Sequence, residues 1–131
     1  MQVGTRIPLG DGAVLTCVAR NGSVIGGAKV LITDANDEND RSIAVLIQYN
    51  GFDYFWASDL GGGKTDATCT GRTTTQVDVE SVVIKAISPG GAHTLISKGG
   101  IDVLHVSRHG SESSTNANLL NGAALTAFLK A

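Results

Sequence analysis

Two segments of the sequence place residues that can bind metal or move protons directly after apolar runs. Phe52–Ser58 is followed by Asp59 and, one residue later, by three glycines, while Ile101–Ser107 is followed by Arg108 and His109. Strand ends beside glycine-rich loops are common ligand sites in layered α/β folds. A carboxylate and an imidazole there can bind a divalent metal such as zinc or manganese. Asp59 and His109 are therefore candidate ligands, with a turn acid and a loop histidine bonded to backbone as the alternatives.

The remaining histidines and the cysteines carry weaker signals. The sequence has three histidines in all. His105 lies inside the second apolar run and is predicted to be a packed or paired core histidine, and His93 lies in a glycine-rich turn without a supporting motif. Cys17 and Cys69 are far apart and form no C-x-x-C pair, which favours two reduced thiols over one disulfide.

Two further segments resemble ligand-binding loops without meeting their requirements. Gly61–Thr65 reads Gly-Gly-Gly-Lys-Thr, but a phosphate-binding P-loop would need glycine at the position of Ser58. Asp34–Arg41 is acidic but lacks the alternating ligands, the glycine and the terminal glutamate of an EF-hand loop. We expect a surface or active-site loop over Gly61–Gln76 and a solvated connection over Asp34–Arg41.

A β-hairpin is predicted to position Asp59. Asn50-Gly51 favours a tight two-residue turn, because both residues accept positive φ. The pairs set by this turn are Tyr49 with Phe52, Ile47 with Tyr54 and Val45 with Trp56 on one face, and Leu46 with Phe55 on the other. Both faces are mainly apolar, so we expect the hairpin in the middle of a layered structure.

The flanking segments give the remaining elements. Strands are predicted over Ala13–Ala19, Lys29–Thr33 and Ile101–Ser107, with a turn at Asp11-Gly12, and helices over Val77–Ile87 and Ala117–Leu129. The first helix is indicated by apolar residues at helical spacing and by Asp78, which can cap its N-terminus.

Length and composition place limits on the class of protein. A chain of 131 residues is predicted to form a single domain over 1–131. A net charge of −2 implies no broad basic surface for nucleic acid. No segment has the pattern of a signal peptide or the length of a membrane span, so a soluble, cytoplasmic protein without membrane association is expected, unless an upstream part is missing.

Several motifs follow one another in a distinctive order. They are Asn39–Ser42, the Asn50-Gly51 hairpin, Ser58-Asp59-Leu60, Asp78-Val79-Glu80, Asp102–Val106 with Arg108–Ser111, and Ser114-Thr115-Asn116. This order resembles the metallo-β-lactamase superfamily, and more narrowly the branch that includes the hydrolase domain of DNA-uptake competence proteins. That branch has N-x-x-S, a hairpin and (T/S)-G-D, and later a strand before His-His-Gly-Ser. The resemblance runs from about Gly4 to Leu120.

The resemblance implies roles for individual positions. Asp59 matches the family's metal-bridging aspartate, and His109 matches the second histidine of its His-His pair. Arg108 stands in the first histidine position, where an arginine can only clamp an anion. Ser58 replaces the usual glycine, and Ser111 would support the loop.

The family's principal ligands have no counterpart in this sequence. Its H-x-H-x-D-H motif and the histidine before the hairpin are absent, because all three histidines lie in the last third of the chain. The resemblance therefore implies the C-terminal half of the family's α/β fold. That half is one side of a layered αββα sandwich, with one mixed sheet and helices on one face. One apolar face of the hairpin would then be bare, which predicts a homodimer.

Two functions follow from this interpretation. The favoured one is a self-associating fragment that lacks a complete metal site and is not catalytic alone, with no certain cofactor. The alternative is a metal-dependent hydrolase for phosphodiesters or other esters. Asp59 and His109 would then bind zinc or manganese, Arg108 would hold an anionic group, and a partner chain or missing N-terminal segment would complete the site. Nucleic acid as a substrate is implied only by the family resemblance.

Overall fold

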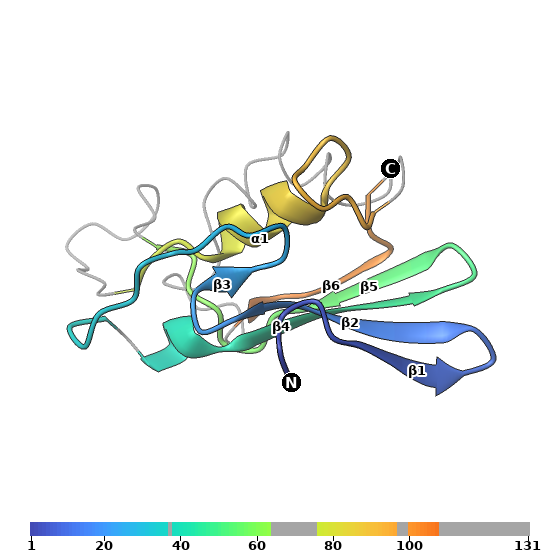
Figure 1. Cartoon of the computed structure of the whole chain (residues 1–131), viewed down its shortest axis with the longest axis horizontal. Coiled ribbons are helices and arrows are strands. Elements are labelled where there is room, and N and C mark those ends of the chain that lie inside the picture. The colour runs from blue at the N-terminus through green and yellow to red at the C-terminus, as the bar shows by residue number, and fades with distance from the viewer. Residues whose placement is uncertain (37, 64–75, 97–99, 108–131) are drawn as a thin grey trace.

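A computed structural model describes residues 1–36, 38–63, 76–96 and 100–107. In these residues the chain forms one mixed, six-stranded sheet with a single short α-helix on one face (Figure 1). The strands are β1 (Arg6–Gly10), β2 (Ala13–Arg20), β3 (Ser23–Val24), β4 (Ile43–Tyr49), β5 (Phe52–Trp56) and β6 (Val103–His105). The helix is α1 (Glu80–Ile87), and a 3-10 helix, η1, spans Glu38–Arg41.

The sheet has the order β1-β2-β4-β5-β6, and β3 also pairs with β2. The neighbours from β1 to β5 are antiparallel, whereas β6 runs parallel to β5. A parallel pair needs a crossover connection, and the chain passes through α1 between these two strands. The prediction of one mixed sheet is confirmed. The described part of the chain is nevertheless mostly β, and α1 is short for the predicted α/β class.

Both predicted two-residue turns are present. Asp11 and Gly12 have φ of 49° and 87°, and Asn50 and Gly51 have φ of 45° and 82°. Positive φ at both central residues matches the right-handed twist of the flanking strands. The β4–β5 register is the predicted one, including the pairs Val45–Trp56 and Leu46–Phe55 of the two opposite faces.

The face of the sheet with Leu46 and Phe55 is the one covered by α1 (Figure 1). Both side chains are fully buried, together with Val79 and Val83 of the helical segment and Ile101 before β6. The register of β2 shifts between Cys17 and Ala19, so that the consecutive residues Val18 and Ala19 both enter this core. The full set of its buried members is Val18, Ala19, Val24, Ile25, Ala44, Leu46, Phe55, Ala57, Leu60, Val79, Val83, Ala86, Ile87, Ile96 and Ile101.

The predicted helix over 77–87 is confirmed in its second part. The N–H of Ser81 donates to Asp78 Oδ1 at 2.9 Å, so Asp78 satisfies one N–H of the first turn, although the N-cap residue is Val79 and not Asp78 as predicted. Val79, Val83 and Ile87 are buried at i, i+4 spacing and face the sheet. The backbone turns extended at Ser88, where the helix ends.

Two strand predictions need correction. Lys29–Thr33 is not a strand, since only Lys29 forms an isolated bridge with Ser23, and Leu31 is 76% exposed. Its β-branched composition favoured a strand, but β2 already pairs with β1 and β3 on one edge and β4 on the other. The strand predicted over 101–107 is present but shorter, at Val103–His105. The helix predicted over 117–129 lies outside the described residues. None of the described helices is long and apolar enough to cross a membrane.

Candidate interaction face and the Asp59 loop

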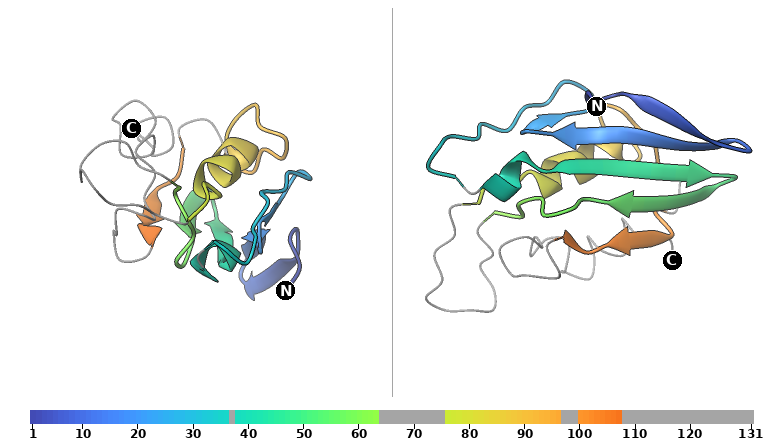
Figure 2. Two further views of the ribbon diagram at one scale, coloured as in Figure 1. Left: turned by 90° about the vertical axis from the view of Figure 1, so that its left-hand side faces the viewer. Right: turned by 90° about the horizontal axis from the view of Figure 1, so that it is seen from below.

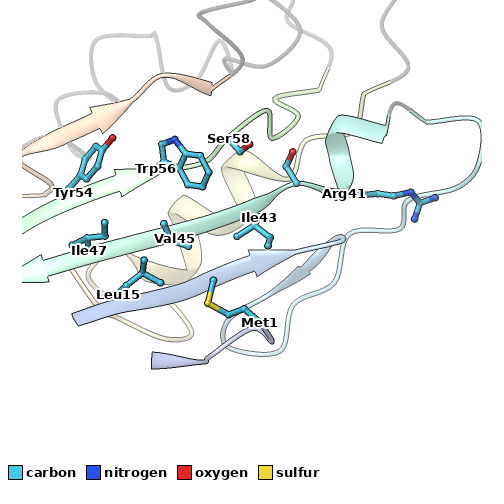
Figure 3. A pocket seen from close by; sticks show the side chains of 10 residues that line it. Met1, Leu15, Arg41, Ile43, Val45, Ile47, Tyr54, Trp56 and Ser58 are labelled. Atoms are coloured by element: carbon cyan, nitrogen blue, oxygen red, sulfur yellow. The ribbon is translucent and has the colours of Figure 1, made fainter. Parts of the chain in front are cut away.

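The side of the sheet opposite α1 carries a second set of apolar side chains. Seen from that side, the strands lie in front of the helix (Figure 2). We call this side the open face, and its central residues are Leu15 of β2, Ile43, Val45 and Ile47 of β4, and Tyr54 and Trp56 of β5 (Figure 3). They line a concave surface that encloses a pocket of about 730 Å³, together with Met1, Arg41, Ser42 and Ser58. Of the central residues, Val45 is buried and the others are half-buried.

The strand register makes the open face continuous across the sheet. One residue from each of β1, β2, β4, β5 and β6 pairs with the next across the sheet, in the order Ile7, Leu15, Ile47, Tyr54 and Val103. This apolar row contains no charged side chain. Its two ends are exposed, at 41% for Ile7 and 43% for Val103. A row of this kind is expected where a sheet is covered by another layer, as on the inner faces of a sandwich.

A second row runs beside the first. It consists of Cys17, Val45, Trp56 and His105, on β2, β4, β5 and β6. The rings of Trp56 and His105 have centroids 6.0 Å apart and are tilted by 58°. His105 is exposed, so its predicted burial in the core is wrong, although it does pair with an aromatic ring. Its neighbours in the sheet cover only one side of the imidazole, because β6 follows β5 at the end of the described strand order.

The charges of the open face are few and positive. Among the described residues that line the concave surface, the charged side chain is that of Arg41. Arg41 lies at the rim and forms ion pairs with Asp34 at 3.5 Å and Glu38 at 3.3 Å. These exposed pairs direct the Arg41 charge toward η1 and the preceding loop. The centre of the open face is therefore neutral.

The loop after β5 carries Asp59, the predicted metal ligand. Ser58 has a φ of 49°, and the N–H of Leu60 donates to the carbonyl of Ala57 at 3.0 Å, which turns the chain sharply. Asp59 is half-buried at this turn. Within residues 1–36, 38–63, 76–96 and 100–107, no three His, Cys, Asp or Glu side chains gather as a metal site. Arg108, His109 and Ser111 lie outside the described residues, so their approach to Asp59 stays a prediction.

Asp40 packs against Gly61 in the loop that carries Asp59, a contact that the sequence did not predict. Its side chain is fully buried, and the Val77 N–H donates to its Oδ2 at 3.0 Å. A Cβ on Gly61 would collide with Asp40 Oδ1 and with the Val77 carbonyl oxygen, so the position requires glycine. The prediction that Asp34–Arg41 is a solvated connection is therefore wrong at Asp40. The signal that could have found it was its place inside the N-x-x-S motif.

A second buried carboxylate joins the Asp59 loop to the end of β6. Glu80 and Ser107 are both fully buried, and the Ser107 hydroxyl donates to Glu80 Oε1 at 3.1 Å. The backbone N–H groups of Val79 and Glu80 donate to the carbonyl of Gly61 at 3.0 and 3.1 Å. Motif segments far apart in the sequence thus meet at one end of the sheet. They are held together by the Ser107–Glu80 hydrogen bond and by the two backbone hydrogen bonds to Gly61.

No family model, curated protein or solved structure gives a match. The resemblance to the metallo-β-lactamase superfamily therefore stays an inference from short motifs, and the function must be argued from the geometry.

The other predicted groups lie away from the Asp59 loop. His93 is exposed in the turn after α1, and its backbone N–H donates to the Ala86 carbonyl at 2.9 Å. Cys17 is a free thiol, as predicted, and lies fully buried in the second row of the open face. Burial raises the pKa of the Cys17 thiol, against smaller opposing effects of the N-terminal ammonium and Arg20. Cys69 lies outside the described residues.

Proposed function

We propose that this chain is a self-associating domain, corresponding to half of a metallo-β-lactamase-type αββα sandwich, and that a second copy covers its open face. The apolar row from Ile7 to Val103 carries this proposal. The same sheet has one face buried under α1, so an equally apolar opposite face calls for a second covering layer.

The size of the open face fits a protein interface. Five strands at a spacing of about 4.8 Å, and the seven residues of β4 at about 3.4 Å each, give an area of roughly 570 Å². An exposed apolar patch of this size is at the upper end of what monomers show, typically about 300–600 Å². Two such faces stacked together bury roughly 1,100 Å², which is near the lower limit for a specific interface.

A second copy is the occupant that the composition of the face favours. A two-fold interface brings the same patch of both chains together, so any charge at its centre would meet a like charge. The row at the centre of the open face is neutral, and the Arg41 charge at the rim already has Asp34 and Glu38 as partners. Nothing in the described centre of the face repels a copy of itself.

The domain is proposed to lack catalytic activity by itself. A catalytic zinc site uses three protein ligands and an open position. Asp59 and His109 would supply two. The half-fold interpretation leaves the ligands of the other half to another chain. Metal analysis of the purified protein, with Asp59→Ala and His109→Ala as controls, separates this proposal from the hydrolase alternative. Stoichiometric zinc or manganese that is lost in both variants would overturn it.

Sedimentation of the wild-type chain and of two matched variants tests the association. Ile47→Arg places a charge at the centre of the open face, while Leu31→Arg places the same charge on a side chain that is 76% exposed in a distant loop. The wild type and Leu31→Arg should be dimers, and Ile47→Arg should be a monomer with an unchanged circular dichroism spectrum. A wild type that sediments as a monomer at all accessible concentrations would refute the proposal.

A further inference from the structure

A titratable side chain lies beside the apolar centre of the open face. His105 of β6 stands opposite Trp56 of β5, and their ring centroids are 6.0 Å apart. Trp56 itself lines the concave surface, and His105 is exposed next to it. A layer that covers Trp56 must therefore also cover at least part of the imidazole.

Histidine is the side chain whose charge ordinarily changes between about pH 5 and pH 8. Removing an imidazolium from water is costly unless a carboxylate or another acceptor replaces the water. In the free chain, a protonated imidazole at this exposed position keeps its water. Covering the face removes that water, so the protonated form favours the free chain.

The side chains that follow His105 across the described sheet are apolar. Its sheet neighbour β5 presents Trp56, and the next strand presents Val45. Among the described residues that line the concave surface, Arg41 carries the charged side chain, and it is cationic. A carboxylate of β6's own segment, Asp102, accepts the Asp53 N–H at 2.7 Å, near the opposite end of the strand.

We propose that His105 makes the self-association pH-dependent, with the dimer formed when the imidazole is neutral and dissociating when it is protonated. This rests on the proposed function, since it concerns the same open face. A two-fold dimer contains two copies of His105. Each proton that must be released on association changes the equilibrium constant about tenfold per pH unit, so two protons give up to about 100-fold per unit. The free chain binds the extra protons, so the dissociation constant rises as pH falls.

Sedimentation equilibrium at about pH 8 and about pH 5.5 tests the proposal, because this interval spans the ordinary titration of histidine. The wild-type dissociation constant should rise at least tenfold at the lower pH. His105→Gln keeps a polar side chain without the titration, and its dissociation constant should be nearly independent of pH. The control is His93→Gln, which changes an exposed histidine in the turn after α1 and should retain the wild-type pH dependence.

The outcomes separate this inference from the proposed function. A dimer at both pH values with an unchanged dissociation constant would refute the role of His105 and leave the self-association standing. A pH dependence that survives in His105→Gln would assign the effect to another group and would also refute it. A monomer at about pH 8 would refute both proposals together. The single tryptophan, Trp56, gives an independent readout, because its fluorescence should report covering of the open face.

Discussion

Phe55 and Tyr54 are neighbours on β5 that point to opposite faces of the sheet, so truncating each one tests a different layer. Phe55 is fully buried under α1, whereas Tyr54 lines the open face. Phe55→Ala removes a ring from a closed core and should lower the free energy of unfolding by about 3–5 kcal/mol. Tyr54→Ala removes a ring from the open face, which the proposed second copy would cover. Its cost within one chain should be below about 1 kcal/mol.

The two variants should also differ in how their stability depends on protein concentration. A dimer of native chains is stabilised by mass action, so the urea midpoint of the wild type should rise with concentration. Phe55→Ala should keep this dependence, because its open face is unchanged. Tyr54→Ala should lose most of it. Since about 3–5 kcal/mol can be much of a small domain's stability, Phe55→Leu, at about 1 kcal/mol, serves as a milder companion variant.

Urea unfolding followed by far-ultraviolet circular dichroism, at low and high protein concentration, measures both effects. The concept of two distinct faces is refuted if Tyr54→Ala costs as much as Phe55→Ala at every concentration. That result would mean that Tyr54 is packed within a single chain. A wild type whose midpoint does not change with concentration would instead remove the second copy from the explanation.

Three further outcomes follow from the buried end of the sheet and the open face. Gly61→Ala should lower the free energy of unfolding by about 1–3 kcal/mol, because the added methyl group collides with Asp40; chemical denaturation measures it, and an unchanged midpoint would contradict the contact. Ser107→Ala removes the hydroxyl that donates to Glu80 and should lower the free energy of unfolding by about 1–3 kcal/mol. Ser107→Thr keeps a hydroxyl and should retain part of that stability. Cys17 should react with a thiol reagent far more slowly in the native protein than in urea, because it is buried and its raised pKa lowers the thiolate fraction; equal rates would contradict that burial.

The local structure of the hairpin could be predicted because a few residues determine it. Asn50-Gly51 permits one tight turn, and that turn fixes every pair along β4 and β5. Which face lies under the helix could not be predicted in the same way, because both faces are apolar. It is decided by the docking of α1 and Ile101, which are distant in the sequence.

The candidate site was less predictable than the fold, since its contacts are between distant polar groups. Asp40 belongs to an acidic run that suggests solvent, yet in the fold it is fully buried and accepts a hydrogen bond from the Val77 N–H. His105 sits in an apolar run that suggests a core, but the side of the sheet to which it points is exposed. Alternation along a strand predicts to which face of the sheet a side chain points. Whether that face is buried depends on the layer that covers it.

The parallel pairing of β5 with β6 has a consequence for the order of folding. The sheet pairs β1, β2, β4 and β5 antiparallel, and tight turns join β1 to β2 and β4 to β5. The contact between β5 and the start of β6 is different, because the hydrogen-bonded residues Asp53 and Asp102 are 49 residues apart. Loop closure over that distance is slow compared with hairpin formation. We therefore expect β6 to join a sheet that already exists, so a newly made chain displays most of its apolar row before His105 arrives. The late strand then carries the group that we propose sets the pH at which two finished chains associate.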